Sequence, residues 1–307
     1  MKRLFVIIFC FLISINIIDR IFLNDDIYTG FKNLFLNPQY KIIINQDTLN
    51  SKYKYHEYSN LFKNTTNFYP SNKNELLDIY YTMMNNGFDN FTYYCNKNYK
   101  TCYEDINDIS HNTTLFTYMN QLVHPYNSFK MVNSNYSVNG KVDITIDSKY
   151  TKNDIIKIDN EINNIINKLN INNVPSINEK IRLFHDYIAD TNVYDEDKAN
   201  NISKYNSDMA IGTLFQGHST CSGYTDTMAI FLDKLGIENI KIITKKHTWN
   251  AIKLDNKWYH LDLTWDDPIT NNKTNIILHD YFLITTDQLL NKDKSEHNFD
   301  RNLYNFL

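Results

Sequence analysis

The sequence contains few cysteines, few glycines and no excess of positive charge. Four cysteines in a chain of 307 residues are too few for a fold held together mainly by disulfides. Only seven glycines occur, and the sequence contains no glycine-rich phosphate-binding loop. Lysine and arginine number 31 against 35 aspartates and glutamates, so no basic stripe is present to neutralise a nucleic-acid backbone. The sequence therefore argues against a disulfide scaffold and against a nucleic-acid partner.

What is present is enough apolar surface for a folded protein. Hydrophobic residues make up 42% of the chain and charged residues 21%, which excludes an intrinsically disordered chain. A length of 307 residues allows two domains, each able to bury its own core. No compact acidic loop indicates a calcium site, and no motif requires another metal or a cofactor.

The N-terminus has the pattern of an export signal. Lys2 and Arg3 precede an apolar run over residues 4–18, interrupted by Ser14 and Asn16. The run is short for a transmembrane helix of about 20 residues, although further apolar residues follow it. Because no small-x-small cleavage site is visible, an uncleaved membrane anchor competes with a cleaved signal peptide. A buried N-terminal helix is the third alternative. We expect residues 1–23 to direct the protein out of the cytoplasm, anchored at the cell surface or secreted.

The next part of the chain predicts a stalk and a small α+β domain over residues 24–151. Residues 24–72 have few sustained patterns and read as a stalk leading into short strands. Residues 74–84 have helical apolar spacing, and Asn86-Gly87 ends the run. Strand-like pieces follow, of which residues 142–146 alternate most cleanly.

Residues 152–307 are predicted to form a second domain that begins with two helices. One apolar helical face runs over residues 154–169, and another over about residues 177–189. Pro175 and Ser176 lie between them as a break and a cap.

Glycines are concentrated around Cys221. Three of the seven lie close to it in the sequence: Gly212, Gly217 and Gly223. Such density in a glycine-poor chain indicates tight turns or close approach of two backbones. Residues 225–235 are spaced as a buried helix that Gly236 ends, so Cys221 is predicted at a helix N-terminus, where the helix dipole favours a thiolate. The alternative is that Cys221 is a small buried hydrophobe.

A predicted β-hairpin carries two further candidate residues. The turn is Asp255-Asn256, between strand-like runs that follow a β-branched stretch over residues 240–244. This turn would fix three cross-strand pairs: Leu254 with Lys257, Trp249 with Asp262, and His247 with Thr264. His247 and Asp262 would then share one face of the sheet, about 7 to 8 Å apart at the backbone. A one-residue shift in register would separate them.

Three stretches of the sequence resemble the transglutaminase-like superfamily, most closely its bacterial surface branch with a cysteine-protease core. They are Cys221-Ser222-Gly223-Tyr224, His247-x-Trp249-Asn250, and Trp258-Tyr259-His260-x-Asp262-x-Thr264-Trp265-Asp266-Asp267-Pro268. The resemblance is specific over about residues 180–283. It implies an α+β, papain-like transglutaminase core, in which a helix bearing the cysteine packs on an antiparallel sheet bearing the histidine and the aspartate.

The resemblance also implies a role for each residue of the site. Cys221 is expected to be the nucleophile, His247 the general base and acid, and Asp262 the group that orients His247. The backbone N–H of Cys221 and the side chain of Gln216 are the candidates for an oxyanion hole, although Gln216 could equally be a solvated loop residue. Trp249 could shield the ion pair or line a substrate cleft.

Other polar residues are predicted to have structural roles. His260 is expected to make a structural hydrogen bond. Cys95 and Cys102, with His111 nearby, are spaced too widely for a zinc site, and a local disulfide suits an exported protein better.

These observations predict an exported enzyme that transfers acyl groups through a thioester on Cys221. Its substrate would be a protein or peptide, at the cell surface or in the cell wall, and no cofactor is needed because the thiolate is itself the nucleophile. Hydrolysis by a protease or peptidase and amine transfer by a transglutaminase both fit this chemistry. The alternatives are an inactive transglutaminase-like module that binds the surface or cell wall, and an N-terminal domain that is the adhesive part.

Overall fold

The computed structural model describes residues 53, 55, 58, 61–137, 139–269 and 276–307. The predicted export signal over residues 1–23 and the first part of the predicted stalk lie outside the described residues. Within the described ranges, no helix is both long enough and apolar enough to cross a membrane. Membrane attachment through the N-terminus therefore stays a prediction.

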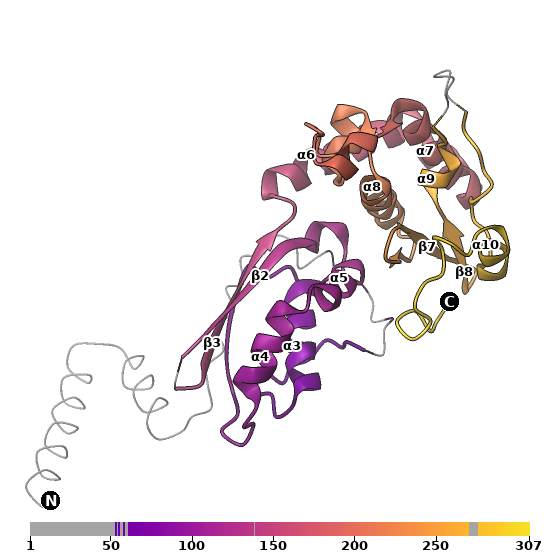
Figure 1. Ribbon diagram of the computed structural model, residues 1–307. Coiled ribbons are helices and arrows are strands. Elements are labelled where there is room, and N and C mark those ends of the chain that lie inside the picture. The colour runs from indigo at the N-terminus through magenta and orange to yellow at the C-terminus, as the bar shows by residue number, and fades with distance from the viewer. Residues whose placement is uncertain (1–52, 54, 56–57, 59–60, 138, 270–275) are drawn as a thin grey trace, which may run out of the picture.

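The N-terminal part of the described chain is a small α+β unit, as expected. Its antiparallel sheet has the spatial order β1-β3-β2, with β1 (Asn90–Tyr94), β2 (Phe129–Tyr136) and β3 (Lys141–Ser148). Three helices lie along this sheet: α3 (Lys73–Asn85), α4 (Cys102–His111) and α5 (Thr113–Gln121) (Figure 1). The predicted helix over residues 74–84 and the predicted strand over residues 142–146 are confirmed.

Helices α4 and α5 occupy a stretch for which only strand-like pieces were predicted, and that prediction is wrong. Helix α4 buries Cys102, Ile106 and Ile109, a spacing of three to four residues that suits one face of a helix. Polar residues fill the positions between them and hide this spacing in the sequence. A disulfide joins Cys102 to Cys95, just after β1, as expected for this pair of cysteines.

The second part of the chain is built around helix α8. Its long helices are α6 (Lys152–Lys168), α7 (Ile177–Thr191) and α8 (Cys221–Lys234), followed by the short α9 (Leu263–Asp266) and α10 (Thr286–Lys292). Its antiparallel sheet has the order β6-β7-β8, with β6 (Asn239–Ile243), β7 (Thr248–Leu254) and β8 (Lys257–Leu261). Two very short strands, β4 (Val193–Tyr194) and β5 (His218–Ser219), pair in parallel, and a π-helical turn over Gly212–Gln216 precedes β5. The helices predicted over residues 154–169, 177–189 and 225–235 are confirmed.

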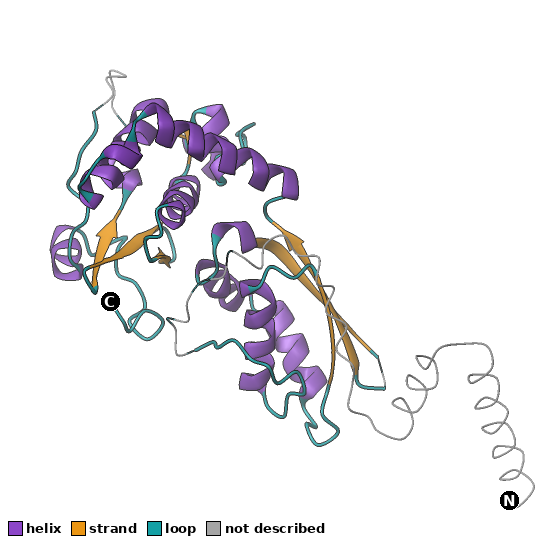
Figure 2. Ribbon diagram, turned by 180° about the vertical axis from the view of Figure 1, so that it is seen from behind, coloured by secondary structure: helices purple, strands orange, loops and turns teal. Residues whose placement is uncertain are grey.

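Helix α8 lies between α6 and α7 on one side and the sheet on the other (Figure 2). Phe184 of α7 stacks on Phe231 of α8, with ring centroids 3.8 Å apart. On the opposite side, Asn250 of β7 donates a hydrogen bond to the carbonyl oxygen of Thr225 in α8. The helix that begins with Cys221 is therefore held on both sides, which fixes the position of its first residue.

The outer face of the same sheet packs against the N-terminal unit. Ile242 of β6 and Trp249 and Ala251 of β7 belong to one apolar cluster with Leu76 and Met83 of α3. The sheet is thus a layer shared by the two parts of the chain, which stabilises both. The predicted domain boundary at residue 151 stays a prediction, because this apolar cluster extends across it.

The hairpin has the predicted turn and register. Leu254 pairs with Lys257, and both turn residues, Asp255 and Asn256, have positive φ angles of 49° and 61°. The pairing ends at Asn250 and Leu261, so the predicted pairs of Trp249 with Asp262 and of His247 with Thr264 are wrong. The physical reason is that the chain leaves the strand after Leu261 and turns into helix α9.

Candidate active site

Cys221 is the first residue of α8, and its thiol is free and half-buried. The close approach that the glycines predicted is present, because a Cβ atom on Gly223 would lie 2.2 Å from the carbonyl oxygen of Ser207. A Cβ on Gly212 would lie 2.4 Å from the carbonyl oxygen of Asn206. The segment before Cys221 can therefore pack directly on the first turn of α8. Cys221 therefore lies at the N-terminal end of α8, as the sequence predicted.

His247 and Asp262 are joined by a hydrogen bond. His247 Nε2 lies 2.5 Å from Asp262 Oδ2, and both side chains are buried. Asp262 is the N-cap of α9, where its Oδ1 accepts from the backbone N–H groups of Thr264 at 3.0 Å and Trp265 at 3.3 Å. The turn into α9 thus aims the other carboxylate oxygen at the imidazole.

Electrostatics keep His247 positively charged at neutral pH. Burial opposes the charge, but the Asp262 carboxylate, with a contribution from Cys221, raises the pKa of His247 from 6.5 to about 10. Burial also opposes the charge of Asp262, yet His247 and His297 lower the pKa of that carboxyl to about 2. The stability contributed by the His247 charge is therefore complete below about pH 6.5 and is lost as the pH rises through about 10.

The same imidazole also reaches the thiol. Cys221 lies close enough to His247 to add to the rise in the pKa of that imidazole. Because Nε2 faces Asp262, Nδ1 is the ring nitrogen left to exchange a proton with the sulfur. The structure thus brings Cys221, His247 and Asp262 together in the order expected from the sequence.

A fourth residue of this cluster, His297, was not predicted. Its Nε2 lies 2.8 Å from Asp262 Oδ2, and the ring is fully buried. His297 follows α10 in an irregular segment, so no periodic pattern or turn signal in the sequence places it beside Asp262.

Trp249 does not line a substrate cleft, and that part of its prediction is wrong. Its side chain is 1% exposed, and His297 and Phe299 of the C-terminal segment meet its ring at centroid distances of 4.8 Å and 6.1 Å. The alternative role, shielding the ion pair, fits the structure: its ring stacks on His247 with centroids 5.7 Å apart. His260 makes the expected structural hydrogen bond, accepting at Nδ1 from Trp249 Nε1 at 2.9 Å. Burial, with repulsion from His297 and Arg301, lowers the pKa of His260 to about 3, so His260 is neutral and able to accept.

Gln216 lies at the end of the π-helical turn, in the segment that leads to Cys221. Its Oε1 accepts a hydrogen bond from the Asn206 backbone N–H at 2.8 Å, so the carboxamide is held rather than freely solvated. Its Nε2 stays available as a donor. Tyr194 is a further neighbour of the thiol: burial raises its pKa to about 12, and Cys221 adds to this effect.

Among the described residues, two groups of histidine and aspartate side chains lie close enough together to bind a metal ion. One is His247, Asp262 and His297, already described. In the other, Asp186 Oδ1 lies 2.9 Å from His185 Nδ1 and 2.7 Å from His279 Nε2. These nitrogens and oxygens pair with one another, so hydrogen bonding accounts for both groups without a cation.

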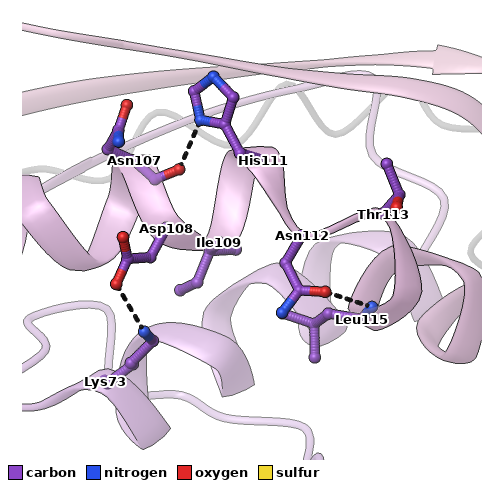
Figure 3. A pocket seen from close by; sticks show the side chains of 8 residues that line it. All are labelled: Lys73, Asn107, Asp108, Ile109, His111, Asn112, Thr113 and Leu115. Atoms are coloured by element: carbon purple, nitrogen blue, oxygen red, sulfur yellow. Dashed lines mark hydrogen bonds and ion pairs between the residues drawn. The ribbon is translucent and has the colours of Figure 1, made fainter.

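A pocket of about 450 Å³ lies on the N-terminal unit, far along the chain from Cys221 (Figure 3). Lys73 Nζ pairs with Asp108 at 3.2 Å across it, and His111 Nδ1 bonds to the carbonyl oxygen of Asn107 at 2.8 Å. His111 cannot share a zinc ion with Cys95 and Cys102, because the disulfide occupies both sulfurs.

Comparisons with known proteins bear on the segment that holds Cys221, His247 and Asp262. Residues 168–263 match the family model of the transglutaminase-like superfamily. No curated protein matches the chain. A solved TGase structure is 19% identical with a TM-score of 0.34, over 48% of this chain and 46% of that one. A candidate cysteine protease from Cytophaga hutchinsonii is 9% identical with a TM-score of 0.28, over 49% of this chain and 65% of that one. The chain thus spans less than two thirds of either solved protein.

The matched segment coincides with the part of the fold that positions these side chains. It contains α7, α8 and the hairpin of β7 and β8, and it ends directly after Asp262. The helix that begins with Cys221 packs on an antiparallel sheet, which is the α+β, papain-like arrangement expected. Over residues 168–263 the chain is similar to the transglutaminase-like superfamily.

Proposed function

We propose that the protein is a cysteine-dependent acyl-transfer enzyme. Cys221 is the nucleophile, His247 the general acid and base, and Asp262 the group that orients His247. The observation that carries this proposal is the position of one imidazole, which bonds to Asp262 at 2.5 Å through Nε2 and reaches the Cys221 thiol with its other side. A half-buried thiol at a helix N-terminus beside a charged imidazole is the setting of an activated cysteine.

The reaction that we propose starts from a thiolate on Cys221 and an imidazolium on His247. The Cys221 thiolate attacks the carbonyl carbon of an amide, and the developing oxyanion accepts hydrogen bonds from the backbone N–H of Cys221 and from Gln216 Nε2. The His247 imidazolium then gives its Nδ1 proton to the leaving amine, which leaves a thioester on Cys221. Neutral His247 takes a proton from the attacking water or amine, and the acyl group leaves as an acid or a new amide.

The substrate we propose is a protein or peptide at the cell surface or in the cell wall. Of the two possible reactions, we favour hydrolysis by a protease or peptidase over amine transfer. An extracytoplasmic location is supported by the apolar segment near the N-terminus and by the Cys95–Cys102 disulfide, since disulfides persist in oxidising compartments. No cofactor takes part in these steps.

A substrate-independent test is acylation by p-nitrophenyl acetate. We expect a burst of about one equivalent of p-nitrophenolate and an acetyl group on the peptide that contains Cys221, seen by mass spectrometry after acid quenching. Added cadaverine distinguishes the fates of the thioester, because an amine-transferring enzyme forms N-acetylcadaverine faster than the direct aminolysis measured with Cys221→Ala. A wild-type protein that shows no burst, or that carries its acetyl group on lysine, would be incompatible with the proposed nucleophile.

A further inference from the structure

Asp262 is held by two histidines that approach the same oxygen atom. His247 Nε2 lies 2.5 Å and His297 Nε2 2.8 Å from Asp262 Oδ2. The other oxygen, Oδ1, already accepts from two backbone N–H groups. Every side of this fully buried carboxylate therefore has a donor, which satisfies its capacity for hydrogen bonds.

The ring of His297 is itself fixed at its other nitrogen. Nδ1 lies 2.9 Å from Asp293 Oδ2, and Asp293 accepts from the backbone N–H groups of Ser295 at 2.9 Å and Glu296 at 3.0 Å. Each ring nitrogen of His297 thus lies within hydrogen-bond distance of a carboxylate oxygen. The result is one chain of contacts from Asp293 through His297 and Asp262 to His247.

Aromatic rings enclose His297 and leave it no room to turn. Tyr281 stacks on it with ring centroids 5.3 Å apart, and Trp249 and Trp265 meet its edge at 4.8 Å and 5.3 Å. Trp249 also stacks on His247, so the same indole contacts both histidines. This enclosure keeps water away from Asp262, which strengthens the bonds made there.

We propose that His297 is a positioning residue for the Cys221–His247–Asp262 site, an inference that rests on the proposed function. It holds the Asp262 carboxylate in the orientation that presents Oδ2 to His247. Without its donor, the carboxylate could rotate about its last bond or accept a water molecule, and His247 would lose its fixed direction toward Cys221. His297 and Asp293 follow α10, outside the matched residues 168–263, so the C-terminal segment completes a site whose other parts lie in the family core.

The test compares His297→Gln with His297→Asn, two amides that differ by one methylene. The Gln amide N–H is long enough to donate to Asp262, whereas the shorter Asn amide is not. The readout is the rate of Cys221 alkylation by iodoacetamide at pH 6 in the full chain. We expect His297→Asn to react about 10- to 100-fold more slowly than wild type, the effect of losing one hydrogen bond to a charged group, and His297→Gln to recover much of the rate.

The matched control is Leu303→Ala, which truncates a fully buried side chain in the same C-terminal segment without touching Asp262. It should lower the unfolding temperature but leave the alkylation rate of the folded protein near that of wild type. Equal rates for the Gln and Asn variants and wild type would overturn the role of His297. A wild-type protein that is itself unreactive at pH 6 would instead refute the proposed function.

Discussion

Replacing Asp262 by Asn is expected to lower the rate of Cys221 acylation by about 10⁴-fold. The carboxylate is what makes His247 an imidazolium, since it lies 2.5 Å from Nε2 and raises the pKa of that ring to about 10. A neutral amide cannot stabilise the imidazolium and can hold the ring in the wrong tautomer. The measurement is the burst rate with p-nitrophenyl acetate, and Cys221→Ala defines the uncatalysed background.

The control for this substitution is Asp280→Asn, the same chemical change on an exposed side chain that pairs with Lys292 at 3.4 Å. Its burst should match that of wild type. If Asp262→Asn retained the wild-type burst while Cys221→Ala abolished it, then Asp262 would have no part in acyl transfer, and another group would have to orient His247.

Replacing Asp226 by Asn should cost about 3 to 5 kcal/mol of unfolding free energy. Asp226 is buried in α8, where its oxygens contact Lys149 Nζ at 2.8 Å, Lys241 Nζ at 3.3 Å and the Tyr150 hydroxyl at 2.7 Å. Burial opposes its charge, but the two ammonium groups lower its pKa to about 2. Its contribution is therefore complete above about pH 4 and is lost as the pH falls through about 2. Without the Asp226 carboxylate, the ammonium groups of Lys149 and Lys241, both buried or nearly buried, would lose their counter-charge on α8.

Urea unfolding measures this loss, and Asp208→Asn is the control. Asp208 pairs with Lys198 at 2.7 Å on the surface, so its loss should cost about 1 kcal/mol or less. Adding Lys241→Met to Asp226→Asn should recover part of the loss, because it removes one of the two unpaired charges. A loss of less than about 1 kcal/mol for Asp226→Asn would show that this cluster does not hold α8 in place.

The parts of the site that could be predicted are those that local geometry determines. A glycine-flanked helix N-terminus placed Cys221, and a two-residue turn with φ angles of 49° and 61° determined the register that brings His247 close to Asp262. Each rule works over a few residues, so no knowledge of the tertiary fold was needed. The strand was predicted too long because nothing in the sequence showed that Asp262 would cap a helix.

The parts that could not be predicted depend on packing between distant segments. His297 reaches Asp262 from 35 residues away, through a segment without regular structure. Trp249 is buried and lines no cleft because His297 and Phe299, from the distant C-terminal segment, pack against its ring. Lys149 and Asp226 meet from 77 residues apart. Sequence periodicity shows that a face is apolar or polar, but not which segment will cover it.

The central claim is that His247 holds Cys221 in a reactive, ionised form. The most direct measurement is the rate of iodoacetamide alkylation at Cys221 from pH 6 to 9, by intact mass, in wild type and in His247→Ala. We expect the wild-type rate to change little over this range, because the imidazolium persists up to a pH of about 10. In His247→Ala the rate should rise about tenfold per pH unit below 8.5, as for an ordinary thiol. Identical profiles for the two proteins would contradict the account and would favour a transglutaminase-like module that binds without catalysis.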